Sequence, residues 1–266
     1  MIEHRALLWR QINKHFFPLT YPLQNELNWE KVAADLTNPA LSYPAYYLVP
    51  HHGLAEGYLS PRQPVVWELI ERLSCIPRTR PILLQQALAG TPGSIVDLGC
   101  GTATTSLQLA HFLPQAHFHL IDLSPYALAA AQWQAQRNGV LQQVSCIHAL
   151  AEATGLPSAQ TDLVLTCLLF HELPRPATQA VLREAWRLLR PGGRLLIFDA
   201  IQQAFPWPWF DAYFNRGLGS MLHEVYWSDY MALPLWKLCQ EMGFCKVERR
   251  LLPVLPWIYQ LISVIK

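Results

Sequence analysis

Between residues 94 and 200, short apolar runs alternate with longer segments of helical periodicity. A chain in which apolar strands alternate with helices folds into a parallel sheet that is covered on both faces. This pattern predicts an α/β domain. The apolar runs are SIVDLG (94–99), HFHLIDLS (117–124), VSCIHAL (144–150), TDLVLTCL (161–168) and GRLLIFDA (193–200), and the helical segments are TTSLQLAHFL (104–113), YALAAAQWQAQRNG (126–139) and PATQAVLREAWRLLR (176–190).

Length and charge limit the number of domains and the kind of partner. With 266 residues, of which 52% are hydrophobic, the chain can bury one large core, alone or with an appendage. The 20 basic and 19 acidic side chains nearly cancel, which is not the pattern of a protein that binds a nucleic-acid backbone. We therefore expect a partner that is neutral or small, and no nucleic acid.

The cysteines and the two ends of the sequence indicate the cell compartment in which we expect the protein. None of the six cysteines forms a CxxC pair, so we expect reduced thiols and a cytoplasmic protein. The N-terminal residues do not resemble a signal peptide. The last sixteen residues (251–266) are apolar but too short for a membrane span and contain two prolines, so we expect terminal strands there. Weak peripheral association with membranes stays open.

The regions on either side of the alternating pattern differ from it. Residues 1–90 are rich in Pro, Tyr and Leu, contain a helical stretch at 64–75, and are expected to form an N-terminal helical cap. Residues 91–266 are expected to form the second domain. Within it, ten of the thirty aromatic residues fall in 205–236. This cluster predicts an inserted lid, at about 202–236, that covers an apolar ligand. The alternative is a small core for an inserted helical pair.

The stretch IVDLGCGTAT (95–104) joins the first expected strand to a helix. Ligands of open parallel sheets bind beyond the carboxyl ends of the strands. Gly99 and Gly101 allow a tight turn and close contact with a ligand, while the carboxylate of Asp97 suits an ammonium group and opposes a pyrophosphate. A dinucleotide fingerprint would need Gly or Ala at position 104, where this chain has Thr. A dinucleotide is therefore disfavoured.

The pattern D-x-G-x-G-x-A, from Asp97 to Ala103, resembles the class I S-adenosylmethionine-dependent methyltransferases, with the general look of their ubiquinone and menaquinone biosynthesis-like, small-molecule branch. The chain departs from the family by having Ala103 where a third Gly is usual. The resemblance implies a Rossmann-like, doubly wound, seven-stranded sheet that is mostly parallel with an antiparallel last strand. It also implies S-adenosylmethionine as cofactor and S-adenosylhomocysteine as product.

The resemblance also implies cofactor contacts along the following strands. Asp122, at the end of the second strand, would accept hydrogen bonds from the ribose diol. Leu150 stands where the family often has an Asp beside the adenine, so only the neighbourhood of Ala151 and Glu152 is carried over. The complete set of expected cofactor-binding residues is Asp97, Gly99, Gly101, Asp122, Leu123, Ala151, Glu152, Cys167 and Leu168.

The acceptor side offers two candidate bases, His171 and His223, because a neutral imidazole can take a proton near physiological pH. A histidine that only packs its loop is the alternative for His171. Expected substrate contacts are Tyr58, Glu224 and Tyr226, and the run HHG at 51–53 precedes Tyr58 in a segment that could fold over the site. No metal is expected, because Arg175 breaks the HExxH spacing after His171.

The sequence therefore predicts methyl transfer from S-adenosylmethionine to oxygen or an activated carbon of a small lipophilic or aromatic molecule. Two alternatives stay open. An NAD(P)-dependent oxidoreductase would share the strand–helix–strand unit and Asp122, and a non-catalytic domain that binds the cofactor or a partner would keep both acids without turnover. Neither the acceptor nor the oligomeric state follows from the sequence.

Overall fold

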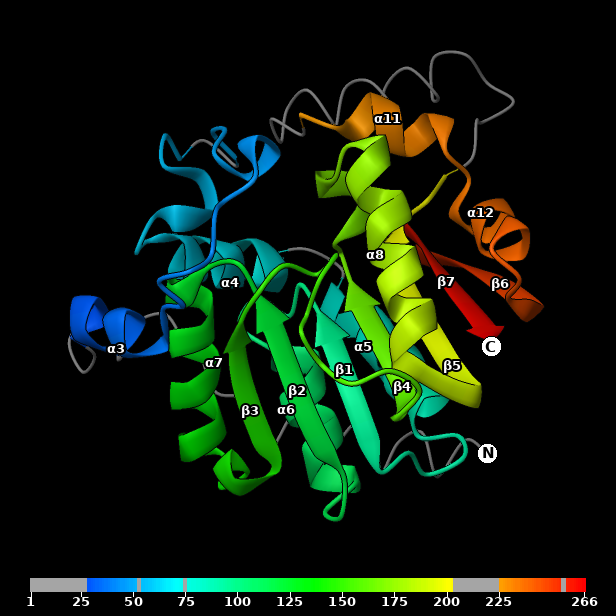
Figure 1. Ribbon diagram of the computed structural model, residues 1–266, viewed down its shortest axis with the longest axis horizontal. Coiled ribbons are helices and arrows are strands. Elements are labelled where there is room, and N and C mark those ends of the chain that lie inside the picture. Colours follow the sequence, from blue (N-terminus) through cyan, green and yellow to red (C-terminus); the bar gives the residue numbers. More distant parts are fainter. Residues whose placement is uncertain (1–27, 52–53, 74–75, 203–224, 255–256) are drawn as a thin grey trace.

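The computed structural model describes residues 28–51, 54–73, 76–202, 225–254 and 257–266. These residues form a seven-stranded sheet with the order β3-β2-β1-β4-β5-β7-β6 (Figure 1). Strands β1 to β5 run parallel, and β7 is antiparallel to both of its neighbours. The expected sheet, including its antiparallel last strand, is confirmed. The strands are β1 Ser94–Leu98, β2 His117–Asp122, β3 Val144–His148, β4 Thr161–Cys167, β5 Leu189–Ala200, β6 Cys245–Val254 and β7 Trp257–Ile265.

Helices cover both faces of the sheet. Leu83 of α5 and Leu107 of α6 pack into the apolar core on one face, and Val181 of α8 and Leu238 of α12 pack into the core on the other. In Figure 1, α8 lies in front of the sheet and α6 behind it. The α-helices are α3 Trp29–Leu36, α4 Gln63–Leu73, α5 Ile76–Ala87, α6 Thr104–Phe112, α7 Pro125–Arg137, α8 Arg175–Leu188, α11 Trp227–Ala232 and α12 Leu235–Glu241, and the 3-10 turns are η1 Ala45–Tyr47, η2 Gly57–Leu59, η3 Leu141–Gln143 and η4 Phe170–Glu172.

The central strands are apolar on both sides because helices cover both sides. Ile95 and Val96 are neighbours in β1 that face opposite ways, and both are fully buried, as are Leu163 and Val164 of β4. Such strands lack the polar–apolar alternation of a half-exposed sheet. Polar side chains in the strands therefore gather where the strands end.

Helix α7 begins immediately after β2. The Ser124 hydroxyl accepts a hydrogen bond from the Ala127 amide at 3.2 Å, and Pro125 occupies the first helical position, where its missing N–H costs nothing. The Ser124 hydroxyl also donates to the Tyr58 carbonyl at 2.7 Å. This serine therefore starts the helix and fastens the N-terminal segment to the carboxyl edge of the sheet.

The described part of the N-terminal segment lies over the carboxyl ends of β2 and β3. Helix α3 packs against α7, and the Asn38 amide donates to Nδ1 of His148 at 2.8 Å. The proposed domain boundary at residue 90 stays a prediction. Of the predicted lid, residues 203–224 lie outside the described residues. Within the described residues, no helix combines the length and apolar character needed to cross a membrane.

Glu184 of α8 holds the loop that follows β3. Its Oε1 accepts hydrogen bonds from the Thr154 amide at 2.9 Å and hydroxyl at 2.6 Å, and its Oε2 accepts one from Nε of Arg187 at 2.7 Å. Burial alone would raise the pKa of Glu184, but these hydrogen bonds outweigh burial and lower the pKa below its usual value. The loop is thereby fixed to α8 at the edge where the strands end.

Replacing Glu184 by Gln is expected to lower the free energy of unfolding at neutral pH by about 1–3 kcal/mol, because an amide cannot accept all of these hydrogen bonds. Since the folded pKa is lowered, the stabilisation is present above the unfolded pKa, near 4.5, and is lost as the pH falls through the folded value. Urea unfolding from neutral pH down to about pH 3.5 should show the difference between wild type and Glu184→Gln narrowing. Glu241→Gln, at an exposed glutamate of α12, is the control. A difference that stayed constant over this range would contradict the prediction.

Candidate functional site

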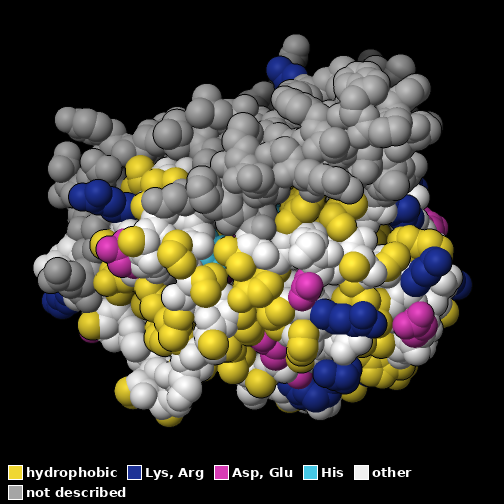
Figure 2. Space-filling view, turned by 90° about the horizontal axis from the view of Figure 1, so that it is seen from above, with side chains coloured by type: hydrophobic (Ala, Val, Ile, Leu, Met, Phe, Trp, Pro, Cys, Tyr) yellow, Lys and Arg dark blue, Asp and Glu magenta, His cyan; other side chains and the backbone are white. Residues whose placement is uncertain are grey.

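A pocket with about 860 Å³ of empty space, open mouth included, lies beyond the carboxyl ends of β1, β2 and β4. Strand order reverses between β1 and β4, and parallel sheets bind ligands at such a point. Eight of the nine expected cofactor-binding residues line this pocket, and Asp97 is the exception. Figure 2 views the molecule from above this edge, and the described side chains there are largely hydrophobic. The expected residues in the wall are Gly99, Gly101, Asp122, Leu123, Ala151, Glu152, Cys167 and Leu168.

The glycine turn after β1 is connected to the end of β2 through Asp122. The Gly101 amide donates to Oδ2 of Asp122 at 2.8 Å, and the Ser124 amide donates to Oδ1 at 2.7 Å. Burial raises the pKa of Asp122, and these amide hydrogen bonds partly counter it. A carboxylate has about four acceptor positions, so the side chain can accept further hydrogen bonds from a diol.

Glycine is required at position 99, whereas an L-residue fits at 103 at some cost. Gly99 has φ +67°, and a Cβ there would come within 2.6 Å of the Leu169 side chain. Ala103 adopts φ 56° just before α6, a left-handed conformation that costs an alanine about 1–2 kcal/mol. The chain thus keeps the left-handed turn at the position where the resembling family usually has glycine.

Asp97 lies in a smaller neighbouring pocket with about 350 Å³ of empty space, which shares Cys100 and Cys167 with the main pocket. The Ser106 hydroxyl donates to Oδ2 of Asp97 at 2.6 Å. Among the described residues, Oδ1 has no hydrogen-bond partner. Burial raises the pKa of Asp97 to about 7, and the charge of Asp122 adds to this effect. A buried carboxylate with one unpaired oxygen is suited to a ligand that brings a positive charge.

A buried arginine in the same small pocket was not expected from the sequence. Arg80 of α5 contacts Glu71 of α4 as an ion pair, and its Nε donates to the Thr105 hydroxyl at 3.3 Å. Burial lowers the pKa of Arg80 to about 10. In this pocket, the Arg80 guanidinium can bind a carboxylate of a ligand, and the Asp97 carboxylate can bind an ammonium group. Arg80 lies in a helix far from the glycine turn in sequence, so local motifs gave no signal for it.

Tyrosines of the N-terminal segment form part of the main pocket wall. The rings of Tyr47 and Tyr58 stack with centroids 5.6 Å apart, and Tyr43 stacks on Tyr47 at 5.8 Å. The Tyr46 hydroxyl donates to Oε1 of Glu152, and burial, followed by this hydrogen bond, raises the pKa of Tyr46. The structure therefore brings Tyr58 and Glu152 to the pocket together with Tyr46 and Tyr47, which the sequence analysis did not select.

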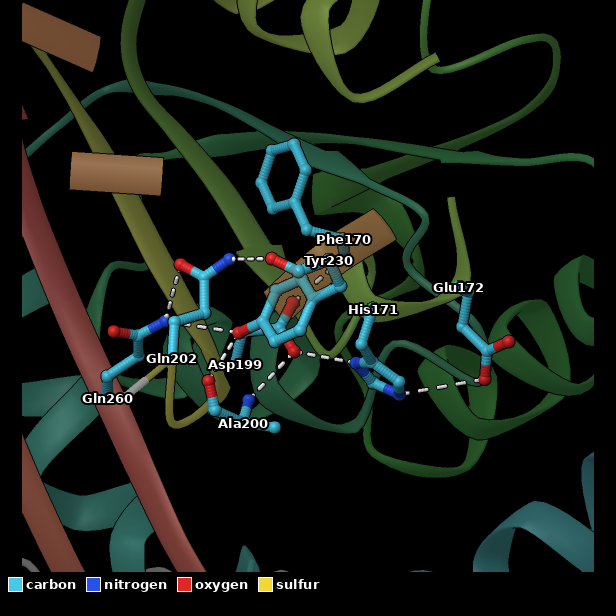
Figure 3. Close-up of polar contacts among 8 residues, drawn as sticks. All are labelled: Phe170, His171, Glu172, Asp199, Ala200, Gln202, Tyr230 and Gln260. Carbon is cyan, nitrogen blue, oxygen red and sulfur yellow. Dashed lines mark hydrogen bonds and ion pairs between the residues drawn. The ribbon is translucent and has the colours of Figure 1, made fainter. Parts of the chain in front are cut away.

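His171 is buried behind the pocket wall. Its Nδ1 is 2.6 Å from Oδ1 of Asp199, and its Nε2 is 3.6 Å from Oε1 of Glu172 (Figure 3). Glu172 lines the pocket, as does His51, whose Nδ1 is 3.0 Å from Oε2 of Glu172. The run HHG had indicated this segment, but His51 and Glu172 were not selected from the sequence.

Of the remaining expected acceptor-side residues, Tyr226 is described by the structure and is not in the pocket wall. Tyr226 lies beside it and contacts Tyr46 edge to face, with ring centroids 6.4 Å apart. His223 and Glu224 lie outside the described residues. In the part of the chain that the structure describes, His, Cys, Asp and Glu side chains do not form a group of three that could hold a metal ion.

Comparisons with known proteins identify relatives of the central region. Residues 95–193 match a family model described as "Methyltransferase domain". The chain is 35% identical over 127 residues to a malonyl-[acyl-carrier protein] O-methyltransferase from Hahella chejuensis, covering 46% of this chain and 41% of that protein. It is 30% identical over 131 residues to a ribosomal RNA small subunit methyltransferase C from Salmonella choleraesuis, covering 48% of this chain and 36% of that protein. The chain spans about two fifths of the length of the curated relatives it matches.

A solved structure shares the fold. The structure of a SAM-dependent methyltransferase from Aquifex aeolicus matches with a TM-score of 0.51 at 18% identity, covering 78% of this chain and 99% of that chain. At this identity the similarity shows the fold alone. Because the sequence relatives include a ribosomal RNA methyltransferase, the expectation that nucleic acid is excluded as a partner is not supported.

Replacing Asp97 by Asn is expected to stabilise the ligand-free protein above pH 7 by about 2–4 kcal/mol, because the variant no longer buries a charge. The raised pKa of about 7 makes wild-type stability fall between the unfolded pKa of 3.8 and pH 7. Urea unfolding should therefore show the largest gain for Asp97→Asn above pH 7 and the smallest near pH 4. Asp35→Asn, at an exposed residue of α3, is the matched control. Equal stabilities of wild type and Asp97→Asn above pH 7 would contradict this assignment.

Proposed function

Since residues 95–193 are a class I S-adenosylmethionine-dependent methyltransferase domain, we propose that the protein transfers a methyl group from S-adenosylmethionine to oxygen or an activated carbon of a small lipophilic or aromatic acceptor. The observation that carries the cofactor part is the pair of carboxylates, Asp97 and Asp122, at the ends of neighbouring strands. One is in the small pocket and the other is in the wall of the large pocket.

The donor groups fit the parts of S-adenosylmethionine. Asp122 offers acceptor positions for a ribose diol, and Asp97 has a buried oxygen without a hydrogen bond among the described residues, suited to the ammonium group. Arg80 adds a cation for the carboxylate at the same end. When bound, S-adenosylmethionine supplies an electrophilic methyl group whose bond to sulfur breaks as the acceptor bond forms, with the electron pair staying on sulfur.

The pocket wall supports an aromatic or lipophilic acceptor. Tyr46, Tyr47, Tyr58 and Trp67 line the large pocket together with Leu169. Aromatic walls give a large contact area and select a flat or apolar ligand by shape. They also keep water from the reacting groups and hold the acceptor in line, which is most of what this reaction requires of the protein.

The two alternatives predict different ligands or no turnover. A nicotinamide cofactor would place its pyrophosphate on the glycine turn, where the carboxylate of Asp97 opposes it. A non-catalytic domain would bind the cofactor but transfer no methyl group. An acceptor panel of phenols, quinones, lipids, amines and small-subunit ribosomal RNA, assayed for methyl transfer, distinguishes a small-molecule enzyme from an RNA enzyme and from a binding domain.

Calorimetry is expected to show binding of S-adenosylmethionine and S-adenosylhomocysteine but not of NAD⁺. Asp97→Asn and Asp122→Asn should each weaken binding by about 10–100-fold, because each removes hydrogen bonds between a ligand and a charged group. Affinity of the wild type should fall as the pH is lowered below 7, because Asp97, with a pKa of about 7, must be ionised to hold an ammonium group. Asp35→Asn should bind as wild type does. Tight NAD⁺ binding without S-adenosylmethionine binding would overturn the proposal.

A further inference from the structure

The large pocket and the small pocket meet at a set of shared residues. Asp97 and Arg80 line the small pocket alone, and Asp122 lines the large pocket alone. In S-adenosylmethionine the sulfonium lies between the amino acid part and the ribose. If these groups hold those two parts, the sulfur and its methyl group lie where the pockets meet. The residues that line both pockets, called the junction residues below, are Trp67, Cys100, Cys167 and Leu168.

One junction residue differs from the others in origin and chemistry. Cys100, Cys167 and Leu168 end or follow β1 and β4, whereas Trp67 comes from α4. Burial raises the pKa of the Cys167 thiol to about 12 and raises that of Cys100 well above its usual value, so neither thiol is an ionised nucleophile at neutral pH. The face of an indole attracts a cation. Trp67 is therefore the junction residue suited to border a positively charged methyl donor.

The backbone at the junction has a conformation that leucine rarely adopts. Leu168 has φ 58°, and its amide donates to the Phe198 carbonyl at 2.8 Å. A left-handed conformation persists at a leucine only where the surrounding structure determines it, and such residues cluster at ligand sites. Contact with β5 therefore holds the junction in a shape that the local sequence does not favour.

Gln63 lies one helical turn before Trp67 and lines the large pocket but not the small one. The two residues are four apart in α4, so their side chains lie on the same face of the helix. Gln63 is 6% exposed, and its Oε1 has no hydrogen-bond partner among the described residues. A buried amide oxygen without a donor destabilises the protein. This oxygen is therefore suited to a ligand that brings an O–H or N–H group.

The acidic side chains of the large pocket oppose an anionic acceptor. Within the described residues, its wall contains Asp122, Glu152 and Glu172 but neither Lys nor Arg. Arg80 is confined to the small pocket, where it contacts Glu71 as an ion pair. A carboxylate or phosphate in the large pocket would thus lose its hydration without gaining a cation. An uncharged acceptor does not meet this cost.

We infer that Gln63 and Trp67 form the acceptor-binding face of the site, and that the acceptor is an uncharged aromatic molecule with a hydroxyl group. This inference rests on the proposed function. The hydroxyl donates to Oε1 of Gln63, and Trp67 borders the methyl group that is transferred. As the acceptor oxygen bonds to the methyl carbon, the electron pair of the carbon–sulfur bond stays on sulfur and the acceptor proton passes to water. Gln63 orients the acceptor and takes up no proton.

The first test places Trp67 relative to the methyl group without using turnover. Fluorine NMR is recorded on protein labelled with 5-fluorotryptophan, and two signals are assigned through Trp67→Phe and Trp186→Phe. Exchanging S-adenosylhomocysteine for S-adenosylmethionine adds the methyl group and the positive charge at sulfur. We expect the Trp67 signal to shift and that of Trp186, which packs against Phe244 outside both pockets, to stay unchanged. An unchanged Trp67 signal at saturation with both ligands would overturn the inference.

The attraction between the indole and the sulfonium is measured by calorimetry. Trp67→Leu is expected to lower the preference for S-adenosylmethionine over S-adenosylhomocysteine by about 2–10-fold, because the variant has no aromatic face for the cation. Trp67→Phe should retain part of this preference. A wild-type preference in Trp67→Leu would contradict the assignment.

The second test separates the acceptor hydroxyl from the ring. 4-Ethylphenol, 4-ethylanisole and 4-ethylbenzoate share a ring and an ethyl group but carry a hydroxyl, a methyl ether and a carboxylate. Their affinities for the protein saturated with S-adenosylhomocysteine are measured by NMR titration at pH 7. The wild type is expected to bind the phenol about 10-fold more tightly than the ether, and the carboxylate most weakly. Gln63→Met, which keeps the length of the side chain, should abolish the preference for the phenol over the ether.

The controls separate the acceptor site from folding and from the cofactor site. Gln85→Met, at an exposed glutamine of α5, should keep the wild-type preference. Gln63→Met should unfold in urea no earlier than wild type, because it removes an unpaired buried oxygen. A phenol preference that persists in Gln63→Met, weaker S-adenosylhomocysteine binding by this variant, or a wild type that does not bind 4-ethylphenol would overturn the inference. Failure of the wild type to bind S-adenosylhomocysteine would instead count against the proposed function.

Discussion

The hydrogen bond from the Gly101 amide to Asp122 is the contact on which the pocket depends. It joins the turn after β1 to the end of β2, two strands that already pair in the sheet, and so fixes the position of the turn over the strand ends. Glycine makes the turn possible, since the backbone at 99 and 101 has positive φ and the position at 99 has no space for a Cβ. Because Asp122 also receives the Ser124 amide, the same carboxylate sets the start of α7. The Asp122 side chain thus holds both the glycine turn and the start of α7 in place beside the pocket.

Several carboxylates at this edge are kept in the interior against a cost in stability. Asp97 shows this most clearly, because burial raises its pKa to about 7 and only the Ser106 hydroxyl donates to it among the described residues. Asp199 differs, because two backbone amides donate hydrogen bonds to its carboxylate and the imidazole of His171 contacts it. The carboxylate of Asp97 therefore keeps an oxygen for a charged ligand, whereas both oxygens of Asp199 already have protein partners. A stability cost at a binding group is the usual sign that a site was selected for its ligand and not for folding.

The sequence predicted the elements that depend on local signals. The starts of β2 and α6 agree with the residues chosen from apolar runs and helical periodicity. Asp122 was found because the family resemblance places an acid at the end of the second strand. Arg80 and His51 were not selected, because their positions follow from how distant helices and loops pack, and no spacing in the sequence expresses that packing. For the same reason, the sequence could select His171 but not its distance from the pocket wall.

Residues that the sequence could predict and residues that it could not lie in different parts of the site. The cofactor side is built from turns that each follow one strand, so its residues are close in sequence to a strand end. The other part of the pocket wall combines His51 from the N-terminal segment with Glu172 after β4. Substitutions in that part of the wall can therefore change the pocket while Asp122 and the glycine turn keep their hydrogen bonds. The two sequence relatives are named for acceptors as different as a malonyl-[acyl-carrier protein] and a ribosomal RNA, so a shared methyltransferase fold does not by itself set the acceptor.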